Sequence, residues 1–150
     1  MQTQIMLREI ESGTEKELYR GSGNLSLSCS PDGKWLALMN MGTEGFLKIM
    51  PADGGEPREL YRFNEKNSPV GLRWTPNGRY ILFEQKQTEE KNYYWWRIPM
   101  EGGEPRKLEL ECNSVFYTSF HPDGRHIVFS THDFKSENSG NYVMENFLPK

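Results

Sequence analysis

The sequence predicts an all-β protein made of repeated four-stranded units, and three observations support this. One phrase occurs three times, as SPDGKWLAL from Ser30, TPNGRYILF from Thr75 and HPDGRHIVF from His121, with its prolines 45 and 46 residues apart. A second phrase, DGGEPREL from Asp53, returns as EGGEPRKL from Glu101 after 48 residues. The residues between these phrases alternate with period two, and no stretch has the period of a helix.

Each repeat divides into four strand-sized pieces separated by turn residues. In the first repeat the expected strands are residues 25–30, 34–40, 45–51 and 56–63. The first turn suits its residues, because Pro presets φ, Asp bonds nearby backbone and Gly accepts positive φ. Since the turn recurs within one chain, we predict a structural role for its nine residues. They are Pro31, Asp32, Gly33, Pro76, Asn77, Gly78, Pro122, Asp123 and Gly124.

The other repeats follow the same plan. Strands are expected at 69–75, 79–85, 93–99 and 104–110, and then at 115–120, 125–131 and 141–147. At the start, 4–10 and 16–20 resemble the closing half of a repeat, because the ELYR of Glu17–Arg20 recurs at Glu59–Arg62. We therefore predict a closing half at 1–23, full units at 24–68 and 69–114, and an incomplete unit at 115–150.

Four antiparallel strands in 42–48 residues are the plan of a β-propeller blade. The residues SPDGKWLAL, FLKIM and DGGEPREL resemble the TolB-like, WD-type propeller repeat family, and the resemblance covers essentially all 150 residues. It implies a scaffold that docks a peptide or protein across its open face. The prediction is thus a non-enzymatic module for protein or peptide interaction, with about three blade equivalents.

About three blades are fewer than the four to eight of known propellers, and bare sheet edges are avoided in natural proteins. Two routes to a closed ring are open. The chain is a piece of a longer propeller, or two copies form a six-bladed homodimer. In the dimer, the strand at 16–20, with Leu18 and Tyr19, would complete the last blade of the second copy by domain swapping.

Composition narrows the classes of partner. A net charge of −3, with basic residues scattered singly, argues against nucleic acid. No run of 18 apolar residues suits membrane insertion, and Met1 begins no signal-peptide pattern. The compartment stays unassigned, and the periplasm stays open if the natural N-terminus is missing. Cys29 and Cys112 are expected as reduced, buried thiols, and no cofactor is predicted.

Candidate binding residues lie on the channel and on the face opposite the repeated turns, where the loops differ between copies. Arg73 and Tyr117, on first strands, could face the channel and touch a ligand, or simply form its solvated wall. Asn67 and Lys91 belong to the variable loops of the open face. The aromatic run Tyr93–Trp96 is interpreted as packing between blades, with a carbohydrate or peptide platform as the alternative.

Catalytic and metal chemistry have weaker signals. His121, His126 and His132 lie in one segment, but His121 occupies the slot of Ser30 and Thr75, so turn capping is the favoured interpretation and no metal site is predicted. No GxSxG motif is present, and we predict no catalytic residue. Two alternatives remain: the propeller gate of a larger prolyl-oligopeptidase-like enzyme, and an excised or engineered repeat fragment without a ligand.

Overall fold

The computed structural model describes residues 2–42, 45–87, 92–112, 115–123, 125–131 and 140–145, and every regular element in these ranges is a strand. The strands are β1 (Gln2–Arg8), β2 (Glu15–Ser22), β3 (Leu25–Cys29), β4 (Trp35–Asn40), β5 (Phe46–Pro51), β6 (Arg58–Arg62), β7 (Asn67–Trp74), β8 (Tyr80–Gln87), β9 (Tyr93–Pro99), β10 (Arg106–Cys112), β11 (Val115–Phe120), β12 (His126–Thr131) and β13 (Gly140–Glu145). The all-β prediction is confirmed.

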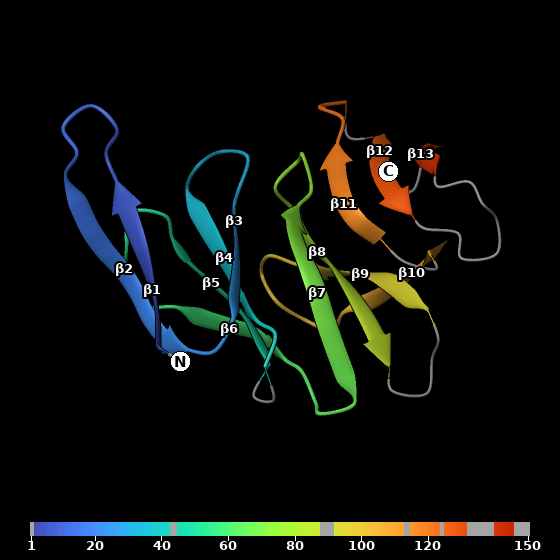
Figure 1. The fold of residues 1–150 in the computed structure, drawn as a ribbon, viewed down its shortest axis with the longest axis horizontal. Coiled ribbons are helices and arrows are strands. Elements are labelled where there is room, and N and C mark those ends of the chain that lie inside the picture. The colour runs from blue at the N-terminus through green and yellow to red at the C-terminus, as the bar shows by residue number, and fades with distance from the viewer. Residues whose placement is uncertain are drawn as a thin grey trace.

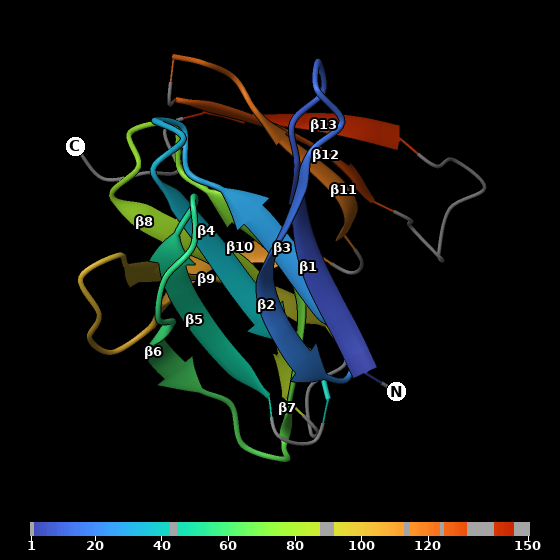
Figure 2. The ribbon, with the colours of Figure 1, turned by 90° about the vertical axis from the view of Figure 1, so that its left-hand side faces the viewer.

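The strands form four antiparallel sheets whose neighbours are consecutive in sequence. These are β1–β2, β3–β4–β5–β6, β7–β8–β9–β10 and β11–β12–β13. Figure 1 shows the sheets following one another from left to right in chain order. Figure 2, seen from the left, places the β1–β2 hairpin in front of the sheet β3–β6. This is the arrangement of successive propeller blades, so the predicted fold class is confirmed.

The turn between β3 and β4 is closed by side chains of the repeated phrase. The Ser30 hydroxyl donates to Asp32 Oδ1 over 2.5 Å and accepts the N–H of Trp35 over 2.9 Å. Gly33 has a φ of 71°, which only glycine adopts without strain. Local bonds thus fix this hairpin, which explains why the phrase recurs between strands.

The turn between β7 and β8 repeats these contacts with other residues. The Thr75 hydroxyl donates to Asn77 Oδ1 over 2.7 Å and accepts the N–H of Tyr80 over 3.1 Å. Gly78 has a φ of 68°. Asn77 therefore does with its amide oxygen what Asp32 does with a carboxylate oxygen. Gly124, the glycine of the third copy, lies outside the described residues.

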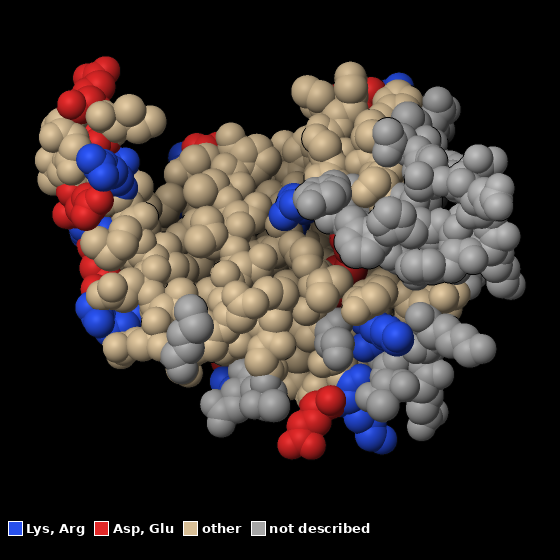
Figure 3. Space-filling view, in the orientation of Figure 1, with Lys and Arg blue, Asp and Glu red and all other residues tan. Residues whose placement is uncertain are grey.

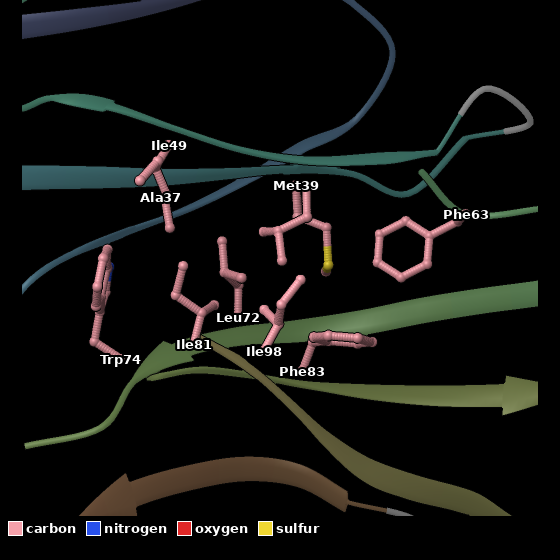
Figure 4. Packing of buried hydrophobic residues seen from close by; sticks show 10 residues of the cluster. Ala37, Met39, Ile49, Phe63, Leu72, Trp74, Ile81, Phe83 and Ile98 are labelled. Atoms are coloured by element: carbon pink, nitrogen blue, oxygen red, sulfur yellow. The ribbon is translucent and has the colours of Figure 1, made fainter. Parts of the chain in front are cut away.

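Apolar clusters fill the spaces between sheets. The largest, between β3–β6 and β7–β10, contains Ala37, Met39, Leu47, Ile49, Phe63, Leu72, Trp74, Ile81, Phe83 and Ile98 (Figure 4). A second, which joins β7–β10 to β11–β13, contains Leu82, Trp95, Leu108, Ile127 and Phe129. A third, which joins the hairpin to β3–β6, contains Ile5, Leu36, Leu38 and Met50. Both four-stranded sheets therefore have a buried apolar cluster on each face.

Hydrogen bonds also link successive sheets. The Trp74 indole N–H donates to the Ser28 carbonyl over 2.9 Å. Arg58, at the start of β6, donates to the carbonyls of Met100 and Glu101 in the turn after β9, over 2.7 and 3.0 Å. Lys16 holds the equivalent position in β2 and donates to the equivalent carbonyl, that of Asp53. The bond from each outer strand to the next sheet's turn is thus itself a repeated feature.

Several strand bounds and the exposure of one cysteine differ from the sequence predictions. Strand β7 begins at Asn67, two residues before the expected 69, because β8 runs on to Gln87 and pairs with it. Cys29 was expected to be buried but is exposed. Leu27, two residues earlier on the same face of β3, is also exposed, so this face of the strand is incompletely covered. The side chain of Cys112 lies outside the part of the chain that the structure describes. Among the described residues, no helix is long and apolar enough to span a membrane.

Candidate functional site

A small polar group lies in the seam between the sheets β7–β10 and β11–β13, among otherwise apolar residues. It consists of Arg73 on β7, Glu84 on β8 and Thr118 on β11. Strand alternation places Glu84 on the face of Leu82, whose cluster also holds residues of β12. Arg73 lies between Leu72 and Trp74, which both pack on the other face. Its Nε atom reaches the Thr118 carbonyl, 3.5 Å away, so the three residues share the seam.

A bulge in β7 makes room for Glu84. The register between β7 and β8 shifts between Val70 and Leu72, so that Gly71 stands out of the ladder with a φ of 60°. A Cβ atom at this position would lie 3.0 Å from Glu84 Oε1. Glycine is therefore favoured here for two reasons: the backbone is in the left-handed conformation, and the carboxyl group of Glu84 lies too close for a side chain.

Burial dominates the electrostatics of Glu84. The residue is 5% exposed, and this burial raises the pKa of its carboxyl group to about 8, although the charge of Arg73 acts to lower it. Glu84 is therefore mostly protonated at neutral pH. The Arg73 guanidinium donates to the carbonyl of Leu72 over 2.7 Å. Because Glu84 is protonated, it offers no negative charge to this guanidinium.

Thr118 adds an unused hydrogen-bonding group to the seam. Its Oγ1 atom is buried and has no hydrogen-bond partner among the described residues. Buried hydroxyls are normally paired, since an unpaired one costs about 1–3 kcal/mol. The seam thus contains a cation, a protonated carboxyl group and an unpaired hydroxyl, which is a combination that a ligand could complete.

The predicted binding residues are distributed unevenly around this seam. Arg73 lies within it, and Tyr117 is the neighbour of Thr118 on β11. Asn67 lies at the opposite end of β7, where it pairs with Gln87, and its N–H donates to the Asn64 carbonyl. Lys91 lies outside the described residues. The structure therefore brings Arg73, but not Asn67, to the buried polar group.

Sequence reasoning missed Glu84, although a signal was present. In the aligned second strands, Glu84 occupies the place of Met39 in the first repeat and of Ser130 in the third. Met39 is fully buried against the following sheet. A carboxyl group in a slot that faces the next blade was the available sign of a buried acid.

The two residues predicted to close a ring lie at the other end of the molecule. Leu18 and Tyr19 on β2 pack on the cluster that contains Ile5 and Leu36. Strand β2 is paired with β1 from Glu15 to Ser22. To complete a sheet in a second copy, β2 must either lose its pairing with β1 or move together with β1. Ring closure stays a prediction.

A surface pocket of about 340 Å³ lies at the outer end of β8–β10. It is lined by Tyr80, Arg97, Pro99, Gly103, Glu104 and Arg106. Arg106 has the position in its repeat that Arg58 and Lys16 have in theirs. Those two residues hold the turn of the following sheet. We therefore interpret the pocket as a place where one blade contacts the next. Within it, the Arg97 guanidinium lies 4.8 Å from the centroid of the Tyr80 ring.

Comparison with known proteins agrees with this fold. No family model and no curated protein sequence matches the chain. Among solved structures, TolB from Acinetobacter baumannii is 19% identical with a TM-score of 0.73, over 95% of this chain and 35% of TolB. Oligogalacturonate lyase from Vibrio parahaemolyticus is 16% identical with a TM-score of 0.76, over 97% of this chain and 40% of the lyase. A prolyl endopeptidase is 19% identical with a TM-score of 0.62, over 93% of this chain and 24% of that protein.

These similarities define the class of fold: consecutive β-propeller blades, similar in structure to those of TolB and of the lyase. The predicted resemblance to TolB-like repeats is confirmed at the level of structure. The chain spans 35% to 40% of the length of TolB and the lyase. The similar structures include enzymes as well as TolB, and a shared fold does not by itself imply a shared activity.

Proposed function

We propose that this chain is a non-enzymatic β-propeller scaffold that binds a peptide or protein segment through a carboxylate at the seam of Arg73, Glu84 and Thr118. The observation that carries the proposal is the protonated Glu84 beside Arg73. Burial keeps this acid neutral, so the guanidinium is available to an acidic group brought by a partner. Tyr117 is proposed to contribute from the neighbouring position, and Asn67 and Lys91 from the open face.

The charge distribution on one face of the molecule favours a peptide over a polyanion. Figure 3 shows charged side chains of both signs on the left-hand edge, over the β1–β2 hairpin, and at the lower right, whereas the middle of this face is mostly uncharged. A single partly buried cation next to this mostly uncharged area suits one carboxylate on an otherwise uncharged segment. The unpaired Thr118 hydroxyl and the protonated Glu84 can each donate one hydrogen bond to that group.

The test begins with a phage-displayed library of random peptides, panned on the chain at about pH 6.5, where Glu84 is protonated. Selected peptides are synthesised and their affinities measured by fluorescence anisotropy. We expect Asp, Glu or a free C-terminus in the binders, and a loss of at least about tenfold in affinity for Arg73→Gln. The control is Arg62→Gln, because Arg62 pairs with Glu59 on the outer strand β6, away from the seam. Binders that are indifferent to Arg73→Gln would refute the proposal.

The pH dependence of peptide affinity gives a second test of the same site. Above about pH 8 the Glu84 carboxyl group ionises and competes with the ligand for Arg73. Affinity for an acidic peptide should therefore fall between about pH 6.5 and pH 9 in the wild type. In Glu84→Gln, which keeps a neutral side chain, the affinity should stay level over this range. An equal fall in both proteins would place the titrating group elsewhere.

A second candidate is that the chain forms part of a larger propeller enzyme. It is favoured by the match to the prolyl endopeptidase and by a match to tricorn protease, of which the chain covers 15% with a TM-score of 0.62. In that case the seam would select the substrates that reach a separate catalytic domain. Cleavage of an acidic peptide by the isolated chain would contradict both candidates, since neither places catalytic residues in it.

A further inference from the structure

The turn between β11 and β12 gathers two imidazoles and a carboxylate. His121 follows β11 directly, His126 is the first residue of β12, and Asp123 lies between them. Asp123 Oδ2 is 3.1 Å from His121 Nδ1 and 2.5 Å from His126 Nδ1. One potential ligand atom from each residue lies within 4.8 Å of the other two. From 34% to 61% of each side chain is exposed, so an ion in solution can reach all three.

The other two copies of the turn close without an imidazole, whereas here His121 Nδ1 accepts the N–H of Asp123 over 3.3 Å. In the other two copies, the hydroxyl of Ser30 or Thr75 donates a hydrogen bond to the Asp or Asn of the turn. The same hydroxyl accepts the backbone N–H of the first residue of the next strand. In the third copy Asp123 Oδ1 accepts the N–H groups of Arg125 and His126, over 2.8 and 3.2 Å. One carboxylate oxygen therefore closes the turn, and the other faces both imidazoles.

We propose that this turn binds a divalent transition-metal ion through His121 Nδ1, Asp123 Oδ2 and His126 Nδ1. Two imidazole nitrogens and one carboxylate oxygen are ligands that Zn²⁺, Ni²⁺ and Cu²⁺ accept, and three protein ligands leave positions for water. Ligands two and three residues apart on one tight turn can occupy one side of an ion.

The other two copies of the turn supply conservative test variants. Asp123→Asn introduces the side chain of Asn77, which makes the same turn with an amide oxygen. His126→Tyr follows Tyr80, and His121→Ser follows Ser30, in the equivalent positions. Each variant removes one ligand but keeps a side chain that this turn already accommodates elsewhere in the chain. Cys29→Ser is the matched control, because the exposed thiol of Cys29 is a rival zinc ligand.

The experiment is calorimetric titration of the untagged chain with zinc chloride at about pH 7.5. We expect one Zn²⁺ per chain, unchanged binding in Cys29→Ser, and a loss of at least about tenfold in affinity in each of the three turn variants. Thermal melts of each variant without metal check that the fold is intact. Failure of the wild type to bind would overturn the proposal, as would undiminished binding by folded Asp123→Asn and His126→Tyr.

Discussion

Replacement of Glu84 by Gln should stabilise the protein, and the gain should grow with pH. In the native state burial raises the pKa of Glu84 from 4.5 to about 8, so folding keeps a proton that the unfolded chain releases. Between these two values the native state loses stability as pH rises, by about 1.4 kcal/mol per pH unit from this group. From about pH 5 to pH 7.5 the loss is about 3 kcal/mol, which Glu84→Gln avoids because glutamine has no proton to release.

Urea denaturation at these two pH values measures the effect directly. The stability advantage of Glu84→Gln over the wild type should be about 3 kcal/mol larger at about pH 7.5 than at about pH 5. The control is Glu59→Gln, which removes a surface ion pair with Arg62 and should change stability by less than about 1 kcal/mol at both. If Glu84→Gln gains no more at the higher pH than at the lower, the carboxyl group is not neutral in the folded seam, and the proposed role of Arg73 fails with it.

Three further changes test the contacts between blades and the closure of a ring. Arg58→Ala removes two hydrogen bonds to the turn after β9 and should lower the free energy of unfolding in urea by about 1 kcal/mol; an unchanged midpoint would make this bond incidental. Trp74→Phe leaves the Ser28 carbonyl without the indole N–H and should cost about 1–2 kcal/mol in the same assay. If two chains close a ring, light scattering should give a mass near twice 17.5 kDa, and Leu18→Asp, folded by circular dichroism, should reduce it to that of one chain. A monomeric wild type would end the closure hypothesis.

Turn chemistry explains how much of this fold could be predicted. The Pro-Asp-Gly phrase closes its turn through bonds among neighbouring residues, such as that from Ser30 to Asp32, so it specifies a hairpin without help from distant parts. The strands between such turns are therefore well placed by sequence, and the strand expected at 93–99 is observed at Tyr93–Pro99. Which sheet faces which is also readable, because repeats that follow in phase stack in chain order.

The candidate site depends on contacts that no single repeat contains. Glu84 belongs to one repeat and Thr118 to the next, and burial at their seam sets the protonation of the acid. Exposure of Cys29 likewise depends on what covers its face of β3, where Leu27 is also exposed, and the alternation of polar and apolar residues in β3 does not reveal it. The residues that repeat along the chain form the turns and the apolar core. The polar groups between blades lie at positions where the repeats differ.

Both proposals depend on residues of the last two sheets that differ from the residues at the same positions of the first repeat. Met39 of the first repeat becomes Glu84 in the second, and Ser30 becomes His121 in the third. The first change puts an acid in the seam, and the second puts an imidazole at the end of β11. The two are separable, because variants of the turn leave Arg73 and Glu84 intact. A chain that binds zinc but no acidic peptide would therefore keep the turn proposal and remove the seam proposal, and the reverse result would do the opposite.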